Sequence, residues 1–385
     1  MNKFDFIDQE RRRRNEANQL RVLRSVTPLD KGRVEINGRT LINVCANDYL
    51  GLSRHPLLLE RAAAYLRKYG AGAPSSRLVC GNYACFAETE SKLAALKQTP
   101  AALLFNAGYQ TNATLLPALC DRHSLILSDR LNHNSIIAGC RLSRCAVELF
   151  AHNDIDDLEN RLRLNADRGF SRMVIVTETV FSMDGDVCDL DRLAALADRY
   201  GAILVVDEAH ATGVLGEKGM GLTCGKQIDV VMGTFGKGCG SFGAYVACSE
   251  KMREYLINCC PGFVYSTALP PAAVGAIDAA LDLIPQMDEA RRRLLANAAF
   301  LRRRLNQMGL STAASTTQII PVIVGREKKA LALSAWLEAR GFLAVAIRPP
   351  SVPAEQSRIR ISLSAVHDRP DVEDLAAAVE EWIKT

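Results

Sequence analysis

The sequence lacks any run of about eighteen uncharged apolar residues, which is the length that a membrane-spanning helix needs. The basic cluster Arg11 to Arg14 is not followed by the apolar core of a secretory signal. Both absences argue against membrane insertion and secretion. We therefore expect a cytoplasmic protein without a membrane partner.

Metal-ligand spacing is also absent. The chain has 12 cysteines, but none of them forms a C-x-x-C pair, and no two histidines stand at ligand spacing. The scattered positions do not suggest a disulfide framework either. We expect reduced thiols and no metal site.

Neither sign of charge is in large excess. Lys and Arg number 47 against 43 Asp and Glu, which gives a formal net charge of +4. Mixed charge of this kind does not make the basic surface that binds nucleic acid, and the run Arg11 to Arg14 is typical of a solvated helix face. A chain of 385 residues with 48% hydrophobic residues instead indicates one large globular domain and a smaller one.

What the chain does contain is an alternation of short apolar runs with segments of helical periodicity, the pattern of a parallel sheet covered by helices. The runs are residues 101–105, 124–127, 147–150, 173–177, 202–206, 229–233 and 244–248. The last two are separated by only ten residues, too few for a crossover helix, so we expect an antiparallel hairpin there. The prediction is a mostly parallel seven-stranded sheet with one antiparallel strand.

The domain organisation follows from where this alternation changes. Helix-rich sequence continues to about residue 310, and a second, shorter set of apolar runs and helices follows it. We expect an N-terminal arm at residues 1–44, a large domain at 45–285, and a small α/β domain at 286–385.

The hairpin connection, TFGKGCGSFG, contains the letters of a dinucleotide fingerprint at Gly238, Gly240 and Gly243. That fingerprint requires a helix directly after it, whereas the residues that follow are strand-like. A phosphate-binding P-loop is also disfavoured, because Lys237 is followed by glycine and not by Ser or Thr. The remaining interpretation is a nucleophilic lysine between flexible glycines.

A possible partner for this lysine lies upstream. Asp207 ends the run 202–206, and His210 follows three residues later. A carboxylate buried at a strand end needs a positive partner, such as a protonated pyridine nitrogen. The alternative, that Asp207 caps a helix and His210 is a core residue, stays open on these two residues alone.

Lys237 follows Asp207 by one helix-and-strand unit, so the two side chains could address opposite ends of one ring. Pyridoxal phosphate requires such a lysine and acid, together with donors for its phosphate. Gly108 and Tyr109 lie between a strand and a helix, where backbone N–H groups bind phosphate, although an ordinary turn is the alternative. His133 follows another strand and could cover the face of the ring.

Six segments in order resemble the α-oxoamine synthases, fold-type I pyridoxal-phosphate enzymes that join an amino acid to an acyl thioester with loss of carbon dioxide. The resemblance spans nearly the whole chain. The segments are NDYLGLS (47–53), FSMDGD (181–186), VDEAHATGVLGEKG (206–219), TFGKG (234–238), AIRPPSVP (346–353) and RIRISLSAVH (358–367).

The resemblance implies catalytic roles for Lys237, which forms a Schiff base with pyridoxal phosphate, for Asp207, which pairs with the ring nitrogen, and for His133, which stacks on the ring. Further cofactor contacts are implied for Gly108, Tyr109, Ser182, His210 and Thr234, with Ser266 and Thr267 coming from the other subunit of a homodimer. Asn47 and Arg360 match residues that hold the carboxylate of the amino acid. Arg21, Arg348 and Ser351 match other positions at the substrate site.

The segment AIRPPSVP favours L-alanine and a pimeloyl thioester, carried by coenzyme A or by an acyl-carrier protein, as substrates within this family. Glycine with acetyl-CoA, or an amino acid with a longer acyl chain, is the alternative. Pro74 and Ser75 replace two glycines of the family pattern, and we expect Pro74 to reshape the acyl entrance. A non-catalytic protein of the same fold is disfavoured, because both Lys237 and Asp207 are present.

Overall fold

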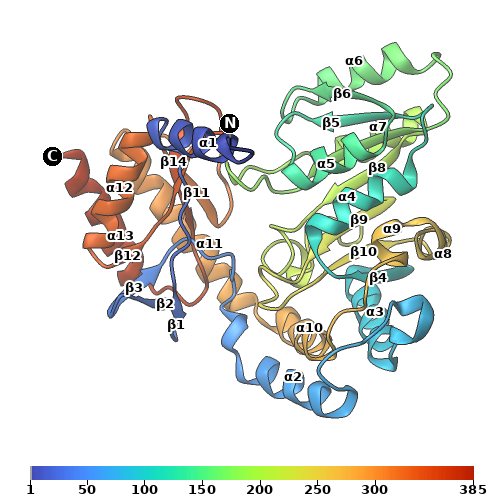
Figure 1. Cartoon of the computed structure of the whole chain (residues 1–385), viewed down its shortest axis with the longest axis horizontal. Helices are drawn as coiled ribbons and strands as arrows, with labels where there is room; N and C mark the ends of the chain where they lie inside the picture. Colours follow the sequence, from blue (N-terminus) through green and yellow to red (C-terminus); the bar gives the residue numbers. More distant parts are fainter. Residues whose placement is uncertain (1) are drawn as a thin grey trace. The chain divides into compact units, whose positions relative to one another are not determined.

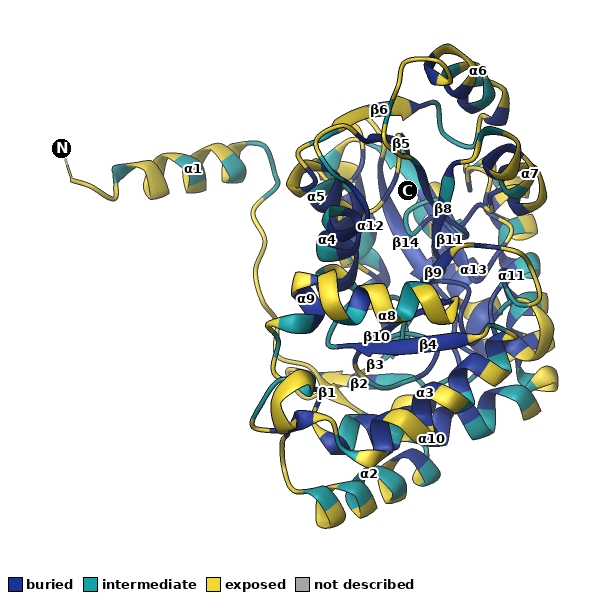
Figure 2. Ribbon diagram, turned by 90° about the vertical axis from the view of Figure 1, so that its right-hand side faces the viewer, coloured by how far each residue is buried: buried dark blue, intermediate teal, exposed yellow. Residues whose placement is uncertain are grey.

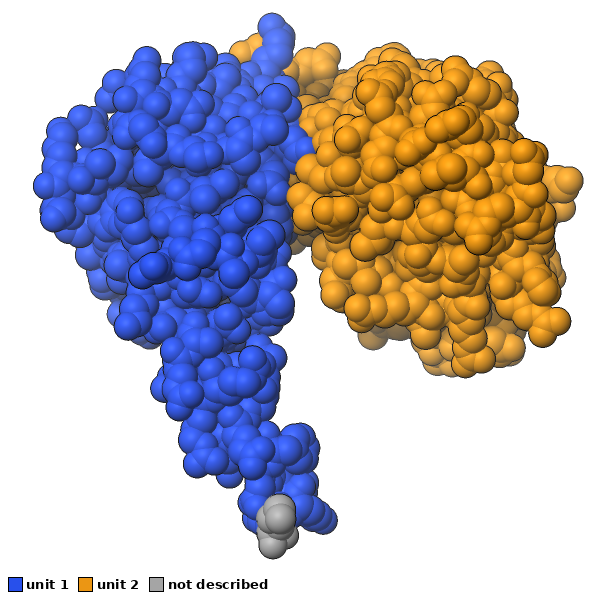
Figure 3. Space-filling view, turned by 90° about the horizontal axis from the view of Figure 1, so that it is seen from above, with its two compact units in different colours: residues 1–47, 183–186, 292–385 blue, residues 48–182, 187–291 orange. Residues whose placement is uncertain are grey.

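The structure, a computed structural model, describes residues 2–385 and divides into two compact units (Figure 3). Unit 1 comprises residues 1–47, 183–186 and 292–385, and unit 2 comprises residues 48–182 and 187–291.

Unit 2 contains a seven-stranded sheet in the order β4-β10-β9-β8-β7-β5-β6 (Figure 1). Its strands are β4 (Ala101–Phe105), β5 (Leu125–Asp129), β6 (Ala146–Phe150), β7 (Met173–Glu178), β8 (Ile203–Asp207), β9 (Val230–Thr234) and β10 (Ala244–Cys248). β10 is antiparallel to both β4 and β9, and the other neighbours are parallel. The predicted sheet, including its single reversed strand, is confirmed.

The strands in the interior of the sheet are apolar except near their carboxyl ends, because both faces of the sheet are covered. Figure 2 shows them in dark blue, and β4, β5 and β10 are buried at every position. The longer connecting helices of unit 2 are α2 (Pro56–Tyr69), α3 (Ala84–Lys97), α4 (Gly108–Leu119), α5 (Asn134–Leu142), α6 (Ile155–Asn165), α7 (Leu190–Tyr200), α8 (Glu250–Cys259) and α10 (Pro271–Leu283). Shorter turns of helix are η1 (Leu52–Arg54), η2 (Arg77–Gly81), η3 (Glu217–Gly219), α9 (Pro261–Val264) and η4 (Ile284–Gln286).

Helix α7 illustrates how local sequence sets these boundaries. The Asp189 side chain accepts a hydrogen bond from the Arg192 N–H at the start of the helix. Gly201 ends the helix in the left-handed region with φ 61°, a conformation that glycine adopts without strain. The helix therefore ends at this glycine.

Unit 1 contains two small sheets and several helices. Its first sheet has the order β1-β2-β3-β12 and its second β11-β14-β13. The strands are β1 (Thr27–Pro28), β2 (Arg33–Ile36), β3 (Arg39–Asn43), β11 (Ile319–Gly325), β12 (Phe342–Leu343), β13 (Ala346–Ile347) and β14 (Ser357–Ser362). Helices α12 (Glu327–Ala339) and α13 (Arg369–Ile383) belong to this unit, and α11 (Asp288–Gln307) begins in unit 2 and continues into unit 1.

The N-terminal segment is grouped with the C-terminal residues, which differs from the separate arm at residues 1–44 expected from the sequence. The physical reason is the parallel pairing of β3 with β12, in which Ile42 lies opposite Phe342. Helix α1 (Asp5–Glu16) has no buried residue, which agrees with the solvated face expected for its arginines. None of the helices within residues 2–385 combines the length and apolar character that a membrane span requires.

The contact between α4 and α5 gives a test of this packing. A Cβ added to Gly139 would lie 2.3 Å from the Asn112 carbonyl oxygen, so Gly139→Ala must push the helices apart. We expect a loss of about 1–3 kcal/mol in the free energy of unfolding, measured by chemical denaturation. Gly72→Ala is the matched control, because nothing lies within 4 Å of its added Cβ. Equal stability of the two variants would contradict the close helix contact.

Candidate active site

A cavity of about 180 Å³ lies in unit 2 at the carboxyl ends of parallel strands and beside the first turns of α4 and α5. This edge is where open α/β sheets place ligands. The lining residues are Gly108, Tyr109, Asn112, His133, Ser135, Glu178, Asp207, Ala209, His210, Met232, Thr234 and Lys237. Seven residues predicted from the sequence therefore line one cavity, namely Gly108, Tyr109, His133, Asp207, His210, Thr234 and Lys237.

Asp207 lies at the end of β8 and is only 6% exposed. Its carboxylate accepts hydrogen bonds from the Asn112 side-chain amide and from the Ala209 N–H, both at 2.8 Å. Both donors are neutral, and within residues 2–385 Asp207 forms no salt bridge with another side chain. A buried carboxylate in this setting stabilises a cationic group that binds next to it.

Lys237 reaches the cavity from the β9–β10 connection. Its Nζ lies 2.7 Å from His210 Nε2, and His210 Nδ1 lies 2.6 Å from the Tyr49 hydroxyl. Tyr49 and His210 are both buried, so this chain of hydrogen bonds is shielded from solvent. Sequence reasoning missed Tyr49, although it lies within the segment NDYLGLS.

His133 is the N-cap residue of α5. Its ring atom Nδ1 lies 2.7 Å from Ser135 Oγ and accepts a hydrogen bond from the Ser135 backbone N–H. The backbone N–H of His133 donates to the Glu178 carboxyl group at 2.6 Å. Burial lowers the pKa of His133, and the nearby charge of Lys237 acts in the same direction against the opposing effect of Asp207. The imidazole is therefore neutral and is held through Nδ1, while Glu178 holds the backbone of the same residue.

Glu178 is a second buried carboxyl group that sequence reasoning missed. It ends β7 and lies directly opposite Asp207 in the parallel ladder. Burial raises its pKa well above the ordinary value, and the charge of Asp207 raises it further. The signal was available in the sequence, because Glu178 ends the apolar run 173–177 just as Asp207 ends its own run.

The first turn of α4 presents donors to the same cavity. The N-cap residue Ala107 supplies no side-chain hydrogen bond, so backbone N–H groups of this turn are uncapped. Thr234 lies next to this turn, since a Cβ on Gly108 would be 3.7 Å from Thr234 Cβ. Uncapped N–H groups at the positive end of a helix suit an anionic group such as a phosphate.

Three predicted cofactor contacts are not among the residues that line the cavity, namely Ser182, Ser266 and Thr267. The Ser266 hydroxyl contacts the Gln110 side-chain amide, and the Asn106 amide donates to the Thr267 carbonyl at 2.6 Å. The expectation that Ser266 and Thr267 serve a second subunit remains a prediction.

The predicted substrate residues gather in two groups within unit 1. Arg360, which is 7% exposed, donates to Asn47 Oδ1 at 3.1 Å and to Ser362 Oγ at 2.7 Å. Arg21 donates to Ser351 Oγ at 3.2 Å, and Arg348 donates to backbone carbonyls of residues 18 and 20. Residues far apart in the sequence are thus paired, and their contact with a substrate remains a prediction.

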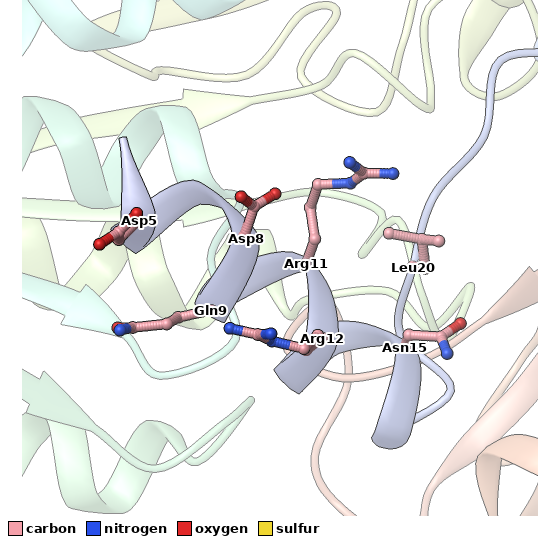
Figure 4. A pocket seen from close by; sticks show the side chains of 7 residues that line it. All are labelled: Asp5, Asp8, Gln9, Arg11, Arg12, Asn15 and Leu20. Carbon is pink, nitrogen blue, oxygen red and sulfur yellow. The ribbon is translucent and has the colours of Figure 1, made fainter. Parts of the chain in front are cut away.

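A larger hollow, of about 670 Å³, lies along α1 and is lined by Asp5, Asp8, Gln9, Arg11, Arg12, Asn15 and Leu20. None of these residues is buried, and Figure 4 shows their side chains spread along the helix without converging on one point. Its carboxylates and guanidinium groups also balance each other. This hollow has no buried ionisable side chain, unlike the smaller cavity, which contains the buried Asp207 and His210.

Across residues 2–385 no group of three or more His, Cys, Asp or Glu side chains is placed to hold a metal ion. All 12 cysteines are free thiols.

Comparison with known proteins identifies relatives over almost the whole chain. Residues 39–379 match the family model for class I and II aminotransferases. A protein of Desulfosudis oleivorans is 67% identical over 99% of both chains. The 8-amino-7-oxononanoate synthase of Geobacter sulfurreducens is 46% identical, with 93% of each chain covered.

Solved structures give a consistent result. A structure of SPT with PLP superposes with a TM-score of 0.91 at 27% identity, covering 98% of this chain and 97% of the other. The 8-amino-7-oxononanoate synthase of Francisella tularensis superposes with a TM-score of 0.76 at 26% identity, covering 89% and 98%. The fold expected from the sequence is confirmed.

The raised pKa of Glu178 predicts a pH-dependent stability difference. Below its ordinary pKa of 4.5 the carboxyl group is protonated in both the folded and unfolded chains. As the pH rises above that value only the unfolded chain loses the proton, so the wild type loses stability relative to Glu178→Gln. We expect the difference in the free energy of unfolding between Glu178→Gln and the wild type to widen from pH 5 to pH 8, by about 1.4 kcal/mol for each unit of pKa elevation.

This gap is measured by chemical denaturation of the cofactor-free protein at several pH values. Glu254→Gln, at an exposed position of α8, reports the pH effect common to the whole protein. A gap that narrows as the pH rises would contradict a protonated Glu178.

Proposed function

The chain belongs to the class I and II aminotransferase family, and from that premise we propose that it is a pyridoxal-phosphate-dependent 8-amino-7-oxononanoate synthase. In this reaction L-alanine condenses with a pimeloyl thioester, releasing the thiol and carbon dioxide and forming the amino ketone used in biotin synthesis. The observation that carries the proposal is the buried Asp207, bonded only to neutral donors, in the same cavity as Lys237.

The residues of the cavity fit pyridoxal phosphate. Asp207 would hold the proton on the ring nitrogen, Lys237 would bond to the aldehyde carbon, and the first turn of α4 with Thr234 would bind the phosphate. His133 would cover one face of the ring. When bound, the cofactor supplies an electron-withdrawing ring that stabilises negative charge at the α-carbon of the amino acid.

Lys237 must be uncharged to remove the α-proton of the amino acid. When the Tyr49 hydroxyl donates to His210 Nδ1, the hydrogen of the neutral imidazole lies on Nε2, which then donates to Lys237. That arrangement requires the lone pair of a neutral amine as the acceptor. In that tautomer the hydrogen-bond chain accommodates the neutral form of Lys237, which can act as a general base.

His133 is suited to contact the acyl donor. Its neutral ring is fixed by Ser135 through Nδ1, which directs the other ring nitrogen away from α5. We assign to it a hydrogen bond to the thioester oxygen, which gains negative charge when the carbonyl carbon is attacked. Glu178 supports this role by holding the backbone N–H of His133.

We assign the amino-acid carboxylate to Arg360 and Asn47. A guanidinium group binds a carboxylate through two parallel hydrogen bonds, and the contact with Asn47 orients Arg360 for this task. Arg21, Arg348 and Ser351 are assigned to the acyl substrate.

We further propose a homodimer in which Ser266 and Thr267 complete the phosphate site of the other subunit. We also propose a cytoplasmic location, which suits twelve free thiols.

A second candidate is condensation of L-serine with a long-chain acyl thioester. The high structural similarity to SPT favours it, whereas the much higher sequence identity to 8-amino-7-oxononanoate synthases favours L-alanine. Glycine with acetyl-CoA remains a third pair within the same chemistry.

Thiol release distinguishes these pairs. We expect release with L-alanine and pimeloyl-CoA or the pimeloyl carrier protein, and less than about 1% of that rate with glycine or L-serine and acetyl- or palmitoyl-CoA. Lys237→Ala should lose about a thousandfold or more of the activity, because it removes the base and the covalent attachment. Lys226→Ala, which removes a surface lysine paired with Asp191, is the control. Full activity in Lys237→Ala would sink the proposal.

Arg360→Lys tests the carboxylate assignment. Lysine keeps the positive charge but loses the paired hydrogen bonds, so we expect the KM for L-alanine to rise about 10- to 100-fold while kcat falls less. Steady-state kinetics at saturating acyl thioester measure both constants. Arg326→Lys, at a position where the arginine side chain is 80% exposed, is the control. An unchanged KM in Arg360→Lys would remove Arg360 from the substrate site.

A further inference from the structure

A fully buried ion pair lies in unit 2 outside the cavity. Lys97, the last residue of α3, contacts a carboxylate oxygen of Glu208, and both side chains are 0% exposed. The ammonium group also donates to the Met220 carbonyl at 2.6 Å and to Thr223 Oγ1 at 3.0 Å. Burial lowers the pKa of Lys97 to about 7 against the opposing effect of Cys224 and Cys239, and the surrounding acceptors stabilise the charged form.

The Glu208 carboxylate is saturated with donors. The Tyr245 hydroxyl donates to it at 3.1 Å, and Thr223 donates through its hydroxyl at 2.8 Å and its N–H at 3.3 Å. The Tyr245 oxygen also lies 2.8 Å from Thr212 Oγ1. A buried network in which every member is satisfied is rigid and allows a single arrangement.

This network fixes the turn that carries His210. The Glu208 carbonyl accepts the N–H groups of Ala211 at 2.9 Å and Thr212 at 3.0 Å, and Thr212 Oγ1 lies 3.1 Å from the same carbonyl oxygen. The Glu208 N–H donates to the Met232 carbonyl of β9 at 2.8 Å. The turn is therefore attached to the sheet through Glu208 and presents His210 to the cavity.

The same turn supports the backbone beside Lys237. A Cβ on Gly238 would lie 2.5 Å from the Thr212 carbonyl oxygen, and a Cβ on Gly213 would lie 3.0 Å from Gly238. At Gly233 an added Cβ would lie 2.3 Å from the Tyr245 ring. Neither the turn nor the lysine connection can shift without displacing the other.

We propose that Lys97, Glu208 and Tyr245 are positioning residues that set the distance between His210 and Lys237, and through it the proton affinity of Lys237. The proposal rests on the proposed function, in which Lys237 attaches the cofactor and acts as the base. None of the three residues lines the cavity, so their effect is transmitted through the turn and the lysine connection.

Substitutions of Lys97 and Glu208 would shift the pKa of Lys237 in opposite directions through charge, but in the same direction through position. The titratable groups that face Lys237 are His210, Asp207, Glu178 and His133, and those that face Lys97 are Glu208, Tyr245, Cys224 and Cys239. If only charge mattered, removing Lys97 would raise the pKa of Lys237 and removing Glu208 would lower it. If position matters, both changes loosen the same contact with His210 and shift this pKa in the same direction.

The test uses the holoenzymes of Lys97→Met and Glu208→Gln. The matched control is Lys92→Met, because Lys92 lies on the same helix and pairs with Asp278 and Asp282 without touching the turn. For each protein the pKa of the visible absorption band of the bound cofactor, kcat, the KM for L-alanine and the melting temperature are measured. Tyr245→Phe is included because it keeps both charges and deletes two hydrogen bonds.

We expect Lys97→Met and Glu208→Gln to shift the pKa of the band in the same direction by about half a unit or more. We also expect kcat to fall about tenfold, with the KM changing less than about twofold. Tyr245→Phe should shift the pKa of the band in the same direction by a smaller amount. This variant therefore tests the positioning role if either charge variant fails to fold. Lys92→Met should change only the melting temperature.

Opposite shifts in the two charge variants, or variants that differ from the wild type only in melting temperature as Lys92→Met does, would overturn the proposal. A wild-type protein that develops no visible band with pyridoxal phosphate would instead overturn the proposed function. The two failures are therefore distinguishable in one set of spectra.

Discussion

A carboxylate buried at the end of β8 and bonded only to neutral donors is the constraint on which the rest of the site depends. At that position α4 brings the Asn112 side-chain amide to one oxygen of Asp207, and the following turn brings the Ala209 N–H to the other. The tight packing of α4 against α5 at Gly139 fixes the backbone that carries Asn112. The packing of α4 against α5 thus determines the hydrogen bonding of the Asp207 carboxylate.

The sheet could be predicted because its strands are buried on both faces. Each apolar run of the large domain became one strand, with boundaries that differ by at most a residue or two. The pairing of β3 with β12 could not be predicted, since it joins residues 300 apart through two-residue contact. Short strands of this kind leave almost no periodicity in the sequence, and only packing of the folded chain selects the partner.

The site was predictable where a residue type carries its own chemistry. Lys237 follows a buried strand and Asp207 ends one, and a charged group in such a place needs a partner of opposite charge. Both residues line the cavity. Asn112, Ser135 and Tyr49 escaped prediction because amides and hydroxyl groups are common and acquire meaning only from their neighbours. Glu178 is different, since it obeys the rule that identified Asp207 and was missed only because no family motif marked it. A buried carboxyl group that keeps its proton carries no charge, and so Glu178 does not compete with Asp207 for a cation.

The reversed direction of β10 has a consequence for how this protein tolerates change in length. Because β10 returns between β4 and β9, both ends of the connection that carries Lys237 are anchored at the same edge of the sheet, with Thr234 directly opposite Ala244. An inserted or deleted residue in that connection must alter the register of two fully buried strands or strain the backbone. The helical crossovers elsewhere in the sheet absorb such changes in their loops. The connection that holds the reactive amine is therefore of fixed length, and variation among related chains should accumulate in the other connections.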